Sequence, residues 1–144
     1  MVYRERIYIA GPLATGPRDP DLVDNKRGQV LQYLRNCHRM IAAGAQLIKK
    51  GYAPFIPALD LLTGIQDGTM RFDDYFGVSE AWLRVSDSFV MLAPSEGALK
   101  EKEIAEQLGL TIYHSLDEVP RVGEQYRIVT GTPWALSGIG GHPK

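Results

Sequence analysis

Short apolar runs alternate with longer helical patterns along most of this chain, and no other feature constrains its fold as strongly. Apolar runs bounded by turn residues predict strands, and apolar residues at three- and four-residue spacing predict helices. We expect strands over residues 6–10, 52–57, 88–93 and 110–113, and helices over about 25–50, 73–85 and 98–108. Strands that alternate with helices form parallel sheets with right-handed crossovers. The sequence therefore predicts an α/β fold, specifically a doubly wound, Rossmann- or flavodoxin-like three-layer sandwich with a parallel sheet of about four to five strands.

Some segments lack this regularity. Residues 13–23 are rich in Gly, Pro and Asp and predict a loop, whereas 58–70 predict a loop or a broken helix. Residues 121–144 are rich in glycine and show little periodicity. A length of 144 residues is typical of one domain with its own core. We therefore expect an α/β domain over 1–120 and a C-terminal tail over 121–144 that packs on the domain or on a neighbouring subunit.

Two of the expected helices carry more detailed signals. The long helix has apolar residues at helical spacing, namely Val30, Leu34, Cys37, Ile41, Ala45 and Ile48. The lone Cys37 lies within this pattern, so we expect a buried, unreactive thiol. In the helix over 73–85, Asp73 or Asp74 is well placed as the N-cap.

Charge and composition exclude several classes of function. A formal net charge of -1 argues against binding to polymeric nucleic acid, because no basic excess is present to displace counterions. The histidines are scattered without the spacing of metal ligands. The N-terminus lacks the apolar core of a signal peptide, and no later run could span a bilayer. We expect a cytoplasmic protein that needs no metal or cofactor and has no membrane partner.

One edge of the predicted sheet is the expected ligand site, because ligands of such folds bind at the carboxyl ends of the strands. Residues 11–13, the turn after Pro57 and residues 94–98 meet at this edge. The turn at 11–13 could hold an anion through backbone amides, although a Gly-Pro turn alone is a weak signal. The small residues Ser95, Gly97 and Ala98 begin a helix whose free amides suit a phosphate or a sugar hydroxyl, or they form an ordinary cap.

Glu101 is the most informative residue near this edge. It is the only charged residue on a helical stripe that otherwise consists of Ala98, Ile104, Ala105 and Leu108. A buried carboxylate without a partner is costly, so its position needs a reason. That reason could be catalysis, but also a favourable interaction with the helix N-terminus or with a buried hydroxyl. Tyr8 interrupts an apolar strand, and its hydroxyl could reach the same edge or belong to an ordinary core tyrosine.

Several motifs, taken in order, resemble the nucleoside 2-deoxyribosyltransferase-like superfamily, which includes nucleoside 5′-monophosphate N-glycosidases. The matching motifs are Ile7–Pro12, Asn36 with Leu47–Pro57, Trp82-Leu83 with Ser86-Asp87, and Ser95–Ala98 followed by Glu101, Ala105 and Gly109. They cover roughly the first four-fifths of the chain. No single motif is very specific, but their order and spacing together are.

The resemblance implies a retaining glycosyl transfer at a nucleoside. Glu101 would attack the anomeric carbon and hold the sugar covalently, and Tyr8 would orient or polarise it. The substrate would be a small-molecule nucleoside or nucleotide, and the protein would be a homo-oligomer. The residues implied in substrate binding are Ala10, Gly11, Pro12, Leu13, Asn36, Asp74, Ser79, Ser95, Gly97 and Ala98.

Ser79 departs from the pattern of the superfamily, which commonly has an aspartate three residues before the tryptophan equivalent to Trp82. Serine can donate a hydrogen bond but is no acid at neutral pH, so the proton donor is open. Asp74 could take over this role, although an N-cap role suits it better. The departure favours a second hypothesis, a nucleotide-binding regulatory module without turnover. A plain structural protein would leave the inward Glu101 unexplained.

Overall fold

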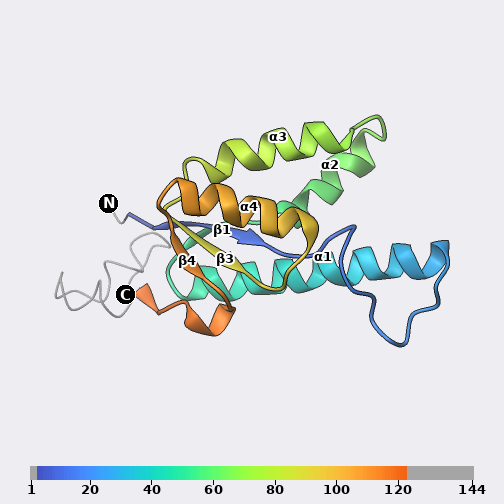
Figure 1. Ribbon diagram of the computed structural model, residues 1–144, viewed down its shortest axis with the longest axis horizontal. Coiled ribbons are helices and arrows are strands. Elements are labelled where there is room, and N and C mark those ends of the chain that lie inside the picture. The colour runs from blue at the N-terminus through green and yellow to red at the C-terminus, as the bar shows by residue number, and fades with distance from the viewer. Residues whose placement is uncertain (1–2, 123–144) are drawn as a thin grey trace, which may run out of the picture.

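The computed structural model describes residues 3–122 as an α/β fold around a four-stranded, all-parallel sheet (Figure 1). The strands are β1 (Arg6–Ala10), β2 (Ala53–Phe55), β3 (Ser88–Met91) and β4 (Thr111–Tyr113). The helices are α1 (Lys26–Lys49), α2 (Asp60–Gln66), α3 (Phe72–Leu83) and α4 (Glu96–Gln107), with 3-10 turns η1 (Pro57–Leu59) and η2 (Leu116–Glu118). The predicted α/β class with a parallel sheet is confirmed, and the arrangement is compatible with a Rossmann-like fold. Most of the tail expected at 121–144 lies outside the described residues.

The strand order is β2-β1-β3-β4, so β1 and β3 occupy the centre of the sheet. Tyr8 of β1 pairs with Phe55 of β2 and with Phe89 of β3. Central parallel strands are covered on both faces, which explains why β1 and β3 are continuous apolar runs in the sequence. The edge strands β2 and β4 are shorter and only partly buried.

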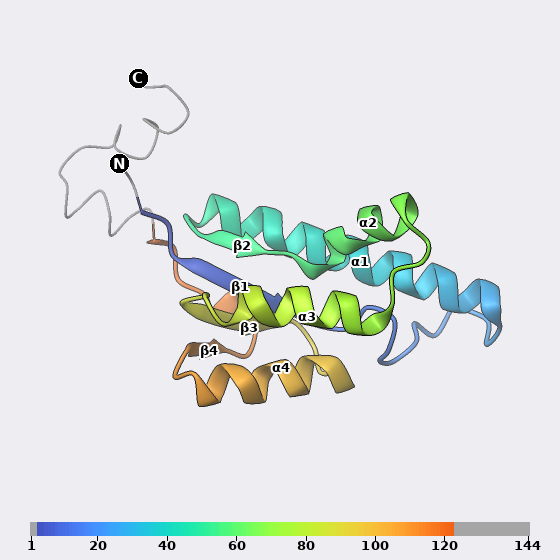
Figure 2. The same ribbon diagram turned by 90° about the horizontal axis from the view of Figure 1, so that it is seen from above.

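Successive side chains of a strand point to opposite faces, and the core is accordingly divided into two clusters. Ile7 and Ile9 of β1 pack with Met40 and Leu47 of α1 on one face. On the other face, Tyr8 packs with residues of α3 and α4. Figures 1 and 2 show α1 on one side of the sheet and α3 with α4 on the other.

The buried face of α1 differs from the apolar pattern in its sequence. Cys37 is buried as expected, but four members of the pattern are 39–57% exposed, namely Val30, Leu34, Ile41 and Ile48. The helix instead packs through a neighbouring face that includes Met40, Gly44 and Leu47. This face lets α1 approach Ile56 closely, because Gly44 has no side chain. A Cβ at Gly44 would lie only 2.3 Å from Cδ1 of Ile56. Helical spacing alone could not distinguish these two adjacent faces.

The start of α3 also differs from the prediction. Neither Asp73 nor Asp74 is the N-cap, because the helix begins at Phe72 and Arg71 occupies that position. The Asp74 carboxylate accepts a hydrogen bond of 2.9 Å from the Arg71 backbone amide. A carboxylate at the third helical position often satisfies the cap amide in this way. The segment expected as a loop or a broken helix consists of η1, α2 and the loop before α3.

None of the helices within residues 3–122 has the length and apolar character needed to cross a membrane.

Candidate functional site

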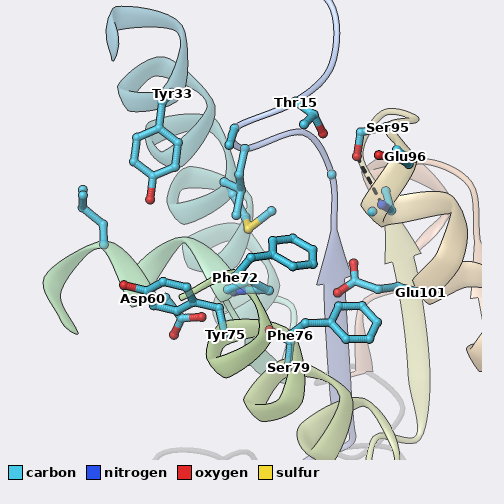
Figure 3. Close-up of a pocket in the computed structure, with 18 of the residues that line it drawn as sticks. Thr15, Tyr33, Asp60, Phe72, Tyr75, Phe76, Ser79, Ser95, Glu96 and Glu101 are labelled. Carbon is cyan, nitrogen blue, oxygen red and sulfur yellow. Dashed lines mark hydrogen bonds between the residues drawn. The ribbon is translucent and has the colours of Figure 1, made fainter. Parts of the chain in front are cut away.

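A cavity of about 710 Å³ lies at the carboxyl end of β1, within the 300–1,000 Å³ typical of small-molecule sites. Its walls come from the loop after β1, from α1, η1 and α2, from α3 and from the start of α4 (Figure 3). This is the edge of the sheet where the sequence predicted a ligand site.

Glu101 lies on the wall that α4 contributes. Ser95 caps this helix by accepting a hydrogen bond of 3.2 Å from the Ala98 amide, which fixes the first turn beside the cavity. One turn further, Glu101 faces the cavity and is mostly buried. Burial raises the pKa of the Glu101 carboxyl to about 7.

Tyr8 is the hydrogen-bond partner of Glu101. Its Oη donates to Oε2 of Glu101, and its side chain is fully buried. The Tyr8 ring is stacked between Phe55 and Phe89, with centroid distances of 5.4 and 6.0 Å. Burial, with the adjacent Glu101 charge, raises the pKa of Tyr8 far above its usual value, so the phenol remains a proton donor. This donation stabilises the ionised form of Glu101 and opposes the effect of burial on its pKa.

Aromatic side chains form the wall that α3 contributes. Phe72, Tyr75 and Phe76 of α3 line the cavity, and Tyr33 of α1 lies on its far side (Figure 3). Phe72 and Phe76 are stacked with centroids 6.0 Å apart. Flat, apolar walls of this kind suit a planar ligand, since aromatic rings stack on one another at such distances.

The loop after β1 is tied to α1 by buried polar side chains. Asn36 Nδ2 donates a hydrogen bond of 2.8 Å to the Leu13 carbonyl, and Asn36 Oδ1 accepts one of 3.0 Å from Gln32. Gln32 Oε1 in turn accepts a hydrogen bond from the Asp19 amide, and the Asp19 carboxylate pairs with Arg35 and with Arg39. Asn36 therefore positions the loop and is not among the residues that line the cavity.

The structure brings many of the sequence-predicted residues together. The predicted residues that line the cavity are Glu101, Gly11, Leu13, Ser79, Ser95, Gly97 and Ala98. Four other candidates are not part of the lining, namely Ala10, Pro12, Asn36 and Asp74. Asp74 instead accepts a hydrogen bond from the Arg71 amide at the third position of α3, whereas the sequence favoured it as the N-cap. Tyr8 reaches the site through its bond to Glu101.

Sequence reasoning missed the aromatic wall and Asp60. Asp60 lines the cavity as the first residue of α2, in a segment whose structure the pattern left open. One signal was present, because this carboxylate closely follows Pro57 at the end of the second expected strand. Lys100 is the one basic residue in the described lining. Within residues 3–122, no three His, Cys, Asp or Glu side chains are grouped to hold a metal ion.

Comparison of the chain with protein-family models, with curated proteins and with solved structures gave no match.

Proposed function

We propose that this protein cleaves or transfers the N-glycosidic bond of a nucleoside or deoxynucleoside, or of its 5′-monophosphate. The observation that carries the proposal is the mostly buried Glu101, which faces an aromatic cavity and accepts a hydrogen bond from Tyr8. A carboxylate in this setting can act as a nucleophile, and an aromatic cavity can hold the planar leaving group. The sequence motifs that resemble the nucleoside 2-deoxyribosyltransferase-like superfamily support the same reaction.

In the proposed reaction, a carboxylate oxygen of Glu101 forms a bond to C1′ of the sugar while the C1′–N bond breaks. The base leaves with the electron pair of that bond and takes up a proton from water. Water, or a second base in a transfer, then attacks C1′, loses a proton and releases the Glu101 carboxylate. Tyr8 orients the attacking oxygen in the first step and stabilises the released carboxylate in the second.

The test is release of free base from a panel of ribonucleosides, deoxyribonucleosides and their 5′-monophosphates, measured by chromatography with and without a second base. Glu101→Gln should lower the rate at least about a thousandfold, because the nucleophile is lost while the side-chain shape is kept. Glu103→Gln is the matched control, since Glu103 is exposed on the same helix, and it should retain the wild-type rate. An equal rate in the Glu101 variant would remove this residue from the mechanism.

Ser79 supports an alternative, a nucleotide-binding regulatory module without turnover. Ser79 is buried and lines the cavity at the position where the superfamily commonly has an aspartate. A hydroxyl there can bind a ligand but cannot protonate a leaving base at neutral pH. This alternative would be favoured if no compound of the panel released its base while nucleotides raised the melting temperature of the protein.

We also propose that the protein is a homo-oligomer. The apolar side chains on the exposed face of α1 are 39–57% exposed in a single chain, and a second copy of the chain could cover them. Light scattering coupled to size-exclusion chromatography should give a mass well above the 16.0 kDa of one chain. A mass equal to that of one chain at all concentrations would contradict this proposal.

A further inference from the structure

Besides Glu101, the cavity lining contains two carboxylates that the proposed reaction does not use, Glu96 of α4 and Asp60 of α2. Asp60 is the first residue of α2 and lies close to the carboxyl end of β2. Figure 3 shows it on the opposite side of the cavity from Glu101, next to Tyr75. If the base of a nucleoside whose C1′ is held at Glu101 points across the cavity, it faces Asp60.

Asp60 has no hydrogen-bond or ion-pair partner among residues 3–122, although it is half-buried. Burial raises the pKa of its carboxyl. Burial raises the pKa of Tyr33 to about 12, and the negative charge of Asp60 contributes to this shift after the larger effects of Cys37 and Tyr75. A half-buried carboxylate in an apolar cavity is costly unless something binds it. Its place in the first turn of a short helix offers only a weak stabilisation.

We propose that Asp60 recognises the base of the substrate by accepting two N–H hydrogen bonds, and that the preferred base is therefore guanine. This inference rests on the proposed function for the orientation of the ligand. An ionised carboxylate has two acceptor oxygens and no donor. Guanine presents two adjacent donors, N1–H and the 2-amino group, on the edge far from the sugar. Adenine, cytosine, hypoxanthine, thymine and uracil each place an acceptor or a C–H group beside their donor.

The inference is tested by binding, so that it does not depend on turnover. Guanosine and inosine differ only in the 2-amino group, and their dissociation constants are measured by calorimetry on the Glu101→Gln variant. Guanosine should bind at least about tenfold more tightly, since inosine leaves one carboxylate oxygen unpaired. Adding Asp60→Asn should abolish most of this preference. Adding Asp73→Asn, the same change at an exposed residue outside the cavity, should leave it intact.

If Asp60→Asn impairs folding, the ligand can be changed in place of the protein. N1-methylguanosine lacks the N1–H donor and should bind the Glu101→Gln protein at least about tenfold more weakly than guanosine. Three results would each overturn the inference. Guanosine could bind no better than inosine, guanosine could fail to bind, or the preference for guanosine could survive Asp60→Asn in a folded protein. Base release without a guanine preference would overturn this inference alone. A guanine preference without base release would overturn only the proposed reaction.

Discussion

At the scale of single residues, the pair of Tyr8 and Glu101 combines two opposing effects on one carboxyl group. Burial favours the neutral acid, whereas the hydrogen bond from Tyr8 favours the carboxylate. The balance is a pKa of about 7 for Glu101, so that both forms are populated near neutral pH. A nucleophile needs the ionised form, which makes the rate of the proposed reaction dependent on this pKa.

We therefore predict that kcat/KM for base release rises with pH and levels off above about 7, the pKa of Glu101. Tyr8→Phe removes the hydrogen bond that favours the carboxylate, so the midpoint of this rise should move to higher pH. The measurement is a pH–rate profile of each protein over the range in which it stays folded. A profile of Tyr8→Phe with an unchanged midpoint would show that Tyr8 does not act on the ionisation of Glu101.

The same pKa predicts how stability depends on pH. The pKa of Glu101 is about 7 in the folded protein against 4.5 for the free side chain, so the folded state binds more protons between these values. Stability from this group is complete below the unfolded pKa and is lost as pH rises through the folded one. Glu101→Gln removes the effect. It should raise the free energy of unfolding above neutral pH by up to about 3 kcal/mol and change it little at acidic pH.

Urea denaturation of the wild type and Glu101→Gln at acidic and at alkaline pH measures this difference. Glu103→Gln, on the exposed side of the same helix, should show no such dependence. A loss of stability in Glu101→Gln at alkaline pH would mean that this carboxylate supports the fold.

At the scale of secondary-structure elements, the sequence predicts what depends on local pattern. Apolar runs predicted the strands, and helical spacing with a capping residue predicted α4. Glu101 lies on α4 and lines the cavity. The packing face of α1 and the position of Asp60 depend on tertiary contacts, which no local pattern contains. Gly44 allows α1 to approach Ile56, and Asp60 enters the cavity because η1 and α2 follow β2 directly.

Two helical glycines make this dependence on tertiary contacts testable. A Cβ at Gly44 in α1 would lie 2.3 Å from Ile56, whereas a Cβ at Gly77 in α3 meets nothing within 4 Å. Gly44→Ala should therefore destabilise the protein by about 1–3 kcal/mol through overpacking. Gly77→Ala should stabilise it by up to about 1 kcal/mol through higher helix propensity. Free energies of unfolding from urea titrations decide this. A stabilising effect of Gly44→Ala would show that α1 or the Ile56 side chain can move to make room for the methyl group.

At the scale of the whole molecule, charge bears on whether the substrate carries a phosphate. The chain has a net charge of -1, and the cavity lining holds three carboxyl side chains, Asp60, Glu96 and Glu101, against the single cation Lys100. On α1, Arg35 and Arg39 do not line the cavity and are paired with aspartates. A dianionic phosphate would thus enter a region of mostly negative charge, with Lys100 and the amides at the start of α4 as its main support.

We therefore predict that a nucleoside is at least as good a substrate as its 5′-monophosphate. Values of kcat/KM for the matched pair, measured at low and at high salt, test this directly. Salt screens long-range attraction between charges, and this mostly negative cavity does not attract anions at long range. Both values of kcat/KM should therefore depend weakly on salt concentration. Lys100→Ala should lower the rate only for the monophosphate. A strong preference for the monophosphate that falls steeply with salt would contradict this prediction and would mean that cations other than Lys100 support the phosphate.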